Sequence, residues 1–79
     1  MQPEDKIRHL ASQANLKIDD IDIKRASRET KYVMFFDIDA VEAKAIKKFW
    51  QSVLQTFTNV TIRRAGVGSS MIEITLYQE

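Results

Sequence analysis

The chain has 79 residues, of which 44% are hydrophobic and 29% are charged, a composition typical of a small globular domain and not of a disordered segment. Its 12 basic and 11 acidic residues leave a formal charge of +1, which excludes nucleic-acid or anionic-membrane binding through bulk charge alone. The absence of cysteine excludes disulfides, thiolate metal sites and thiol catalysis.

The first part of the chain predicts a helix followed by a strand. Pro3 and the two carboxylates after it suit a helix start, because proline lacks an N–H and the carboxylates meet the positive end of the helix dipole. Apolar residues then recur at helical spacing, so we expect a helix over residues 4–14 that stops at Asn15. Isoleucines alternate with charged residues over 20–26, which predicts a half-buried strand.

The middle of the chain predicts a second strand and a second helix. Residues 32–38, Tyr-Val-Met-Phe-Phe-Asp-Ile, form the strongest strand pattern because they are rich in aromatic and branched side chains. Asp39, three residues before Glu42, is expected to cap the helix that follows. The apolar stripe of that helix consists of Ile46, Phe49, Trp50, Val53 and Leu54.

The end of the chain predicts a hairpin. Apolar and polar residues alternate over 59–64 and again over 72–76, which indicates two half-buried strands. The segment Gly66–Ser70 between them contains the only two glycines of the chain, which favours a turn.

The order helix, strand, strand occurs twice, and a faint repeat accompanies it, since Ile23-Lys24-Arg25-Ala26 reappears as Ile62-Arg63-Arg64-Ala65. Shared helix and strand periods are an alternative explanation of this repeat. A right-handed crossover places both helices on one face of the sheet and leaves a gap for the last strand. We therefore expect one α+β domain over residues 1–79, a circularly permuted ferredoxin-like fold with pseudo-repeats at about 4–39 and 43–78 and a four-stranded antiparallel sheet.

Strand parity and the repeat together predict which side chains face the helices. The repeat aligns Val33 with Ile72 and Phe35 with Ile74, and we assign all four to the helix side. The opposite face then receives an apolar strip that we expect to be a partner interface, formed by Tyr32, Met34, Phe36, Ile38, Met71 and Tyr77. A small domain with a few exposed aromatic residues is the alternative interpretation.

The sequence predicts no catalytic, cofactor or metal site. His9 is the only histidine, and nothing near it resembles a catalytic triad or a metal-binding set. The carboxylates within 19–22 lack the glycine and the distal glutamate of a calcium loop, and Gly66–Ser70 lacks the lysine of a P-loop. Because no catalytic motif is present, we do not predict an enzyme. Lys24, Arg25, Arg63 and Arg64 are expected to form solvated basic rims, so we do not predict a nucleic-acid-binding protein either.

In this order of elements the chain resembles the periplasmic C-terminal domain of type II secretion system protein M, and more loosely the pilus assembly protein PilO. The matching segments are Leu10–Ile18, Val33–Ile38, Phe49–Leu54, Val60–Arg64 and Ile72–Leu76. The resemblance implies a non-enzymatic scaffold of an inner-membrane assembly platform that needs no cofactor. It also implies a homodimer that binds secretion protein L or its pilus equivalent, a periplasmic location, and a membrane anchor outside this chain; without the resemblance the expected location is cytoplasmic.

Two further resemblances leave other functions open. The stretch from Leu16 through Phe36 and the helix after it looks like an ACT domain, which would imply a small regulatory ligand such as an amino acid. An RNA recognition motif shares the parent fold and stacks bases on aromatic residues of its middle strands, and Lys31–Phe36 is similar to its core strand.

Overall fold

The fold combines two helices with one antiparallel sheet, as the sequence predicts. A computed structural model describes residues 2–66 and 70–78, apart from the side chain of Ile38. In chain order its elements are α1 (Pro3–Gln13), β1 (Asp20–Arg25), β2 (Glu29–Phe35), a short 3-10 helix η1 (Ile38–Ala40), α2 (Ala43–Thr56), β3 (Val60–Ala65) and β4 (Met71–Tyr77). The predicted α+β class, with a four-stranded antiparallel sheet, is confirmed.

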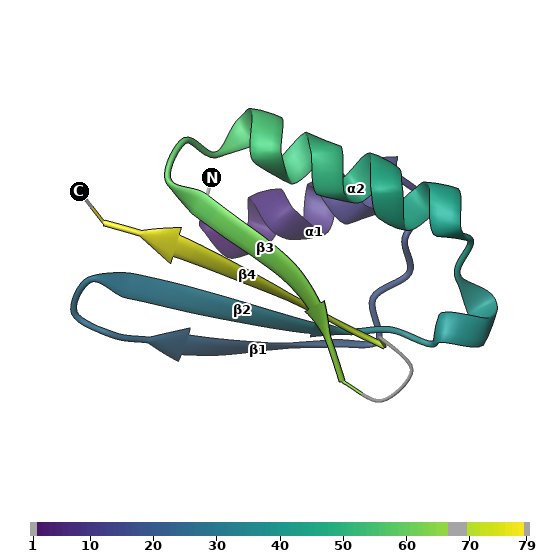
Figure 1. The fold of residues 1–79 in the computed structure, drawn as a ribbon, viewed down its shortest axis with the longest axis horizontal. Coiled ribbons are helices and arrows are strands. Elements are labelled where there is room, and N and C mark those ends of the chain that lie inside the picture. The colour runs from purple at the N-terminus through teal and green to yellow at the C-terminus, as the bar shows by residue number, and fades with distance from the viewer. Residues whose placement is uncertain (1, 67–69, 79) are drawn as a thin grey trace.

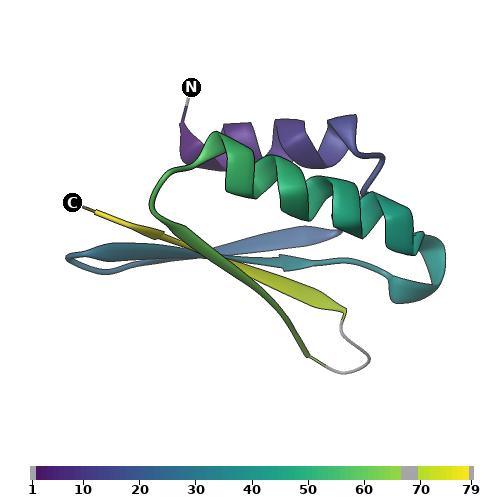
Figure 2. The same cartoon turned by 45° about the horizontal axis from the view of Figure 1, so that its top comes forward.

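The last strand lies inside the sheet. The strand order is β1-β2-β4-β3, so β4 pairs with β2 on one side and with β3 on the other, and β1 and β3 form the two edges. Both helices lie on one face of the sheet, α1 towards β1 and α2 towards β3 (Figures 1 and 2). In the described part of the chain, no helix covers the opposite face (Figure 2).

The end of α1 follows the prediction that Asn15 stops this helix. Asn15 has a φ of 59°, in the left-handed region that ends helices. The Leu16 N–H donates to the carbonyl oxygen of Ala11 at 2.9 Å and the Asn15 N–H to that of Ser12 at 3.1 Å, the pair of bonds that defines a Schellman motif. Leu16 is only 3% exposed, so the turn also brings an apolar side chain into the core.

The start of α2 differs from the prediction. Asp39 does not cap this helix: α2 begins at Ala43, and Glu42 at the N-cap position makes no side-chain capping bond. The Asp37 carboxylate instead accepts a hydrogen bond from the Asp39 N–H at 3.0 Å and caps the 3-10 turn. Val41 has extended backbone angles between this turn and α2, which places Asp39 too far upstream to reach the first helical N–H groups.

The orientation of β2 is opposite to the prediction. Tyr32 is 4% exposed, Met34 is fully buried and Phe36 is 4% exposed, and all three belong to the core beneath the helices. Tyr32 lies directly opposite Ile23 and Ile74, which fixes its side of the sheet. Burial raises the pKa of the Tyr32 hydroxyl, and the nearby Arg25 opposes this shift. These three residues therefore do not form an exposed strip.

The length of the first hairpin explains this difference. The Ala26 N–H donates to the carbonyl oxygen of Glu29 at 2.8 Å, which leaves Ser27 and Arg28 as a two-residue turn. Odd-numbered residues of β1 are thereby paired with even-numbered residues of β2, as in the pair Ile21 and Met34. In the second hairpin, even-numbered residues of β3 are paired with even-numbered residues of β4, as in the pair Ile62 and Ile74. The internal repeat therefore aligns β2 with β4 one residue out of register, which assigns β2 to the wrong face.

The remaining interface residues have different outcomes. Met71 and Tyr77 lie on the face away from the helices, because their neighbours in the register are Phe35 and Glu29. Ile38 begins η1, and its side chain lies outside the described part of the structure. The predicted turn at Gly66–Ser70 is described only at its two ends, where Gly66 has a φ of 90° and an added Cβ would lie 2.7 Å from the Met71 sulfur.

The orientation of β2 can be tested by a pair of neighbouring substitutions. We expect Met34→Ala to lower the free energy of unfolding by about 3 kcal/mol, because it leaves a cavity in the core. Phe35→Ala on the opposite face is expected to cost about 1 kcal/mol or less. Urea unfolding of both variants measures the difference, and a larger loss for Phe35→Ala would contradict this orientation of the strand.

The left-handed turn at Asn15 yields a second expectation. Asn15→Ala should lower the free energy of unfolding by about 1 kcal/mol, since a Cβ without a polar group disfavours this backbone region. Asn15→Gly is the matched control and should be at least as stable as the natural chain. Thermal unfolding of the two variants checks this order, and a more stable alanine variant would argue against the turn.

Candidate interaction surface

The sheet face away from the helices, called the open face below, is the first candidate surface. The register assigns to it Asp20, Asp22 and Lys24 of β1, Glu29, Lys31, Val33 and Phe35 of β2, Met71, Glu73, Thr75 and Tyr77 of β4, and Thr61, Arg63 and Ala65 of β3. Four carboxylates and three basic groups thus surround a small apolar centre. The open face is more polar than the strip that the sequence predicts.

The apolar centre of the open face includes Val33 and Phe35, which the sequence predicts to face the helices. Val33 is 6% exposed but lies outside the main core cluster, and Phe35 is half-buried directly opposite Met71. Tyr77 is 40% exposed at the other end of β4. Asp37 was the one residue in the sequence that argued against the predicted orientation of β2, because that orientation would have directed its carboxylate towards the helices.

An ion pair crosses the open face between its two last strands. Arg63 Nη2 lies 3.1 Å from Glu73 Oε2, with 69% of the arginine side chain exposed and 16% of the glutamate side chain. Hydrogen bonding from Arg63 lowers the pKa of Glu73 most, burial opposes this effect, and the charges of Arg63, Lys31 and Lys24 lower it further. The ion pair with Arg63 therefore favours the charged form of Glu73.

The two edges of the sheet are the second candidate surface. In an antiparallel ladder, the backbone groups of alternate residues point towards the paired strand and away from it. The Tyr77 N–H donates to the carbonyl oxygen of Asn59 at 3.0 Å, and the Ala26 N–H donates to that of Glu29 at 2.8 Å. Asn59 and Ala26 therefore point their backbone groups into the sheet, as does every second residue along the same strand. The backbone groups that point outward belong to the residues between them: Ile21, Ile23, Arg25, Val60, Ile62 and Arg64. Both edges therefore present backbone donors and acceptors to a partner strand.

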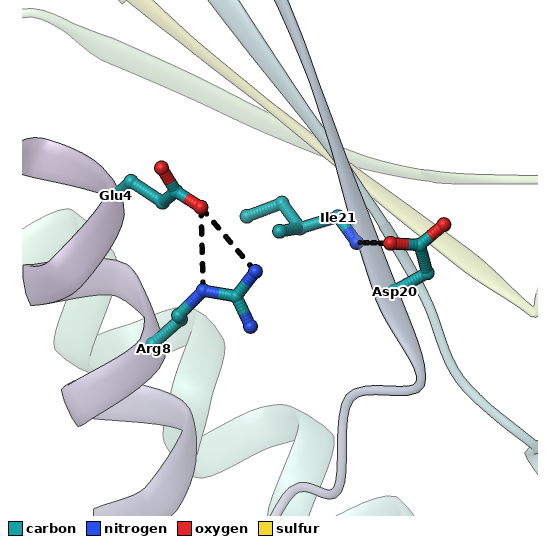
Figure 3. Close-up of polar contacts among 4 residues, drawn as sticks. All are labelled: Glu4, Arg8, Asp20 and Ile21. Atoms are coloured by element: carbon teal, nitrogen blue, oxygen red, sulfur yellow. Dashed lines mark hydrogen bonds and ion pairs between the residues drawn. The ribbon is translucent and has the colours of Figure 1, made fainter.

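The β1 edge is partly capped by its own side chain. The Ile21 N–H donates to Asp20 Oδ1 at 2.8 Å, which shows that this N–H is free of the β1–β2 ladder (Figure 3). The ion pair of α1 between Arg8 and Glu4, at 3.3 Å, lies above this edge (Figure 3). Polar groups of both signs thus flank the start of β1.

An apolar flank of α2 accompanies the β3 edge. Leu54 is 49% exposed and Trp50 one turn earlier is half-buried. Ala45 and Lys48 lie near the end of α1, and at about 100° per residue Trp50 and Leu54 fall on the opposite flank of the helix. This flank faces away from α1, on the side where α2 contacts β3.

A cleft between the helix ends is the third candidate. It has a volume of about 550 Å³ and is lined by Ala14, Asn15, Ala40, Glu42, Lys44, Ala45 and Lys48. Lys44 Nζ lies 3.3 Å from Glu42 Oε2, and both side chains are largely exposed. The cleft therefore combines small side chains with exposed charges of both signs at its rim.

Neither a search for metal-binding groups and membrane-spanning helices nor a comparison with known proteins identifies a further site. Within residues 2–66 and 70–78, no group of three or more histidine, aspartate or glutamate side chains is arranged to hold a metal ion. None of the helices described is both long and apolar enough to cross a membrane. No protein-family model, no curated protein and no solved structure matches the chain.

The Arg63–Glu73 pair makes stability depend on pH. Because the folded state lowers the pKa of Glu73, the pair stabilises the fold above the ordinary pKa of glutamate, and this contribution is lost as the pH falls through the lowered value. We expect the stability difference between the natural chain and Glu73→Gln to be largest near neutral pH, to be small because Arg63 is exposed, and to vanish in acid.

Carboxyl titration by NMR gives the direct measurement of this effect. In the variant Arg63→Ala, the pKa of Glu73 should rise towards its ordinary value, because the largest cause of the shift has been removed. Lys24→Ala is the control, since the charge of Lys24 contributes least to the lowered pKa of this carboxyl. An unchanged Glu73 titration in Arg63→Ala would show that the ion pair does not form in solution.

Proposed function

We propose that this chain is a non-enzymatic protein-interaction domain of a type II secretion or type IV pilus assembly platform. The proposal includes a permuted ferredoxin-like fold, in which the usual first strand comes last. Support comes from the two helix–strand–strand units and from the strand order β1-β2-β4-β3, which is the order that such a permutation requires. The resemblance of the sequence to secretion protein M supports the same assignment.

The observation that carries the proposal is a sheet with one face and both edges left uncovered by the described part of the chain. Sheet edges bind partner strands through backbone hydrogen bonds, and half-exposed apolar groups such as Leu54 and Phe35 add buried area. A specific interface typically buries about 800 Å² on each partner.

The proposed partners are a second copy of the chain and the periplasmic domain of secretion protein L or its pilus equivalent. In this role the domain works on the periplasmic side of the inner membrane and needs no cofactor. Its mechanism is association: the sheet supplies the geometry of the interface, and the charges around it supply specificity.

A ligand-sensing role of the ACT type is a second candidate, favoured by the cleft between the ends of α1 and α2. Lys44 and Lys48 at its rim suit a carboxylate, and Glu42 suits an ammonium group, so a free amino acid has the right chemistry. A thermal-shift screen with the standard amino acids tests it. An RNA-binding role is less favoured, because Tyr32 and Phe36 are buried and the open face carries more carboxylates than basic groups.

The proposed function predicts two associations that can be measured directly. Sedimentation of the 79-residue chain at micromolar to millimolar concentrations should show self-association. Titration with the isolated periplasmic domain of secretion protein L should show saturable binding. A chain that stays monomeric and also fails to bind protein L would overturn the proposal, and an amino-acid thermal shift in that case would favour the second candidate.

A further inference from the structure

At one end of the sheet, the two edges carry opposite charges. The β1 edge begins with Asp19 and Asp20, and the β3 edge ends with Arg63 and Arg64, all four of them exposed. These residues lie on opposite sides of one continuous sheet in the order β1-β2-β4-β3. At this end, one copy of the chain therefore presents acidic residues where a neighbouring copy presents basic ones, whereas β1 itself ends with Lys24 and Arg25.

The backbone groups of the two edges also match. The outward N–H and carbonyl groups of β1 include those of Ile21 and Ile23, and those of β3 include Val60 and Ile62. Because the strands of the sheet alternate in direction, β1 and β3 run antiparallel to one another. A second copy placed beside the first with its helices on the same side thus meets β3 with an antiparallel β1.

From this match we propose that β1 of one copy pairs with β3 of another and extends the sheet from chain to chain. The inference rests on the proposed interaction function and names its self-partner and the strands that meet. In the best register Ile21 lies opposite Ile62 of the second copy and Ile23 opposite Val60, all on the helix side. Asp20 then lies opposite Arg63 of the second copy and Asp19 opposite Arg64, so charge and apolar character match together.

Charge also decides against pairing of β3 with a second β3. That symmetric arrangement gathers Arg63 and Arg64 of both copies around one edge without adding a carboxylate from β1. Like charges brought together across an interface oppose association, whereas Asp19 and Asp20 on β1 favour it. The β1 edge is therefore the better complement of β3.

Pairing rearranges the cap at the start of β1. In the single chain the Asp20 carboxylate accepts the Ile21 N–H at 2.8 Å (Figure 3). In the paired state this N–H donates to the carbonyl of Ile62 in the second copy. The Asp20 carboxylate turns to Arg63 of the second copy, which also holds the Glu73 carboxylate of its own chain. The cap thus protects the edge in isolated chains and is exchanged for an interchain bond on association.

The neighbouring helices complete the interface. The flank of α2 that carries Trp50 and the half-exposed Leu54 lies beside β3, and the flank of α1 that carries Glu4 and Arg8 lies beside β1. Extension of the sheet brings these two flanks together. Because the pairing is head to tail, it does not close on two copies, and species larger than dimers are expected.

Charge reversal tests the pairing. Asp20→Arg and Arg63→Asp should each weaken self-association about tenfold or more, measured by sedimentation at low salt, since each places like charges opposite one another. An equimolar mixture of the two variants should associate again, because the arginine introduced in one variant meets the aspartate introduced in the other. Asp5→Arg on the exposed surface of α1 is the control with the same change in net charge as Asp20→Arg, and it should leave association unchanged.

A backbone substitution provides a test that does not depend on charge. Ile62→Pro removes an N–H that points away from β4, so it should abolish association while the fold is retained in circular dichroism. If Ile62→Pro does not fold, the charge-reversal mixture decides alone.

The outcomes separate this inference from the proposed function. If Asp20→Arg, Arg63→Asp and Ile62→Pro all self-associate as well as the natural chain, the edge pairing is overturned and the scaffold role stands. A natural chain that is monomeric at all concentrations yet binds secretion protein L would likewise overturn the edge pairing and leave the scaffold role in place. Salt-sensitive association that is lost in both charge variants and restored in their mixture supports the pairing.

Discussion

The packing of two helices onto the even-numbered residues of β2 and β4 is the constraint on which the rest of this structure depends. Phe49 of α2 and Ile7 of α1 are fully buried against Met34, Ile72 and Ile74. In a domain this small, a core of so few large side chains supplies most of the stabilising burial. Once these residues face the helices, every neighbour in the sheet is assigned to the opposite face.

The character of the open face follows from that assignment. With Met34 inside, Val33 and Phe35 must point outward, and they share their face with the Arg63–Glu73 ion pair. The result is a face with a small apolar centre inside a ring of charges. Such a face suits reversible contacts more than a permanent hydrophobic interface.

The edges are the more distinctive surface. β1 and β3 lie at opposite ends of the sheet because β4 occupies its interior, and each edge keeps a row of outward backbone groups. Asp20, which caps the Ile21 N–H, and the arginines at the end of β3 give the two edges opposite charges at one end of the sheet. Proteins use charged side chains to limit pairing at sheet edges. Where two edges carry opposite charges, the same side chains disfavour pairing between like edges and favour pairing between unlike ones.

The sequence by itself determined the elements of this protein: the two helices, the four strands, the stop at Asn15 and the outward placement of Met71 and Tyr77 all follow from local patterns of apolar and polar residues. Local chemistry suffices there because each element records its own period and its own end signals. The tertiary structure alone decided the orientation of β2 and the start of α2. Apolar side chains occupy both faces of β2, so its period is ambiguous, and the two-residue turn at Ser27 and Arg28 set the register that buries Met34 and exposes its neighbours.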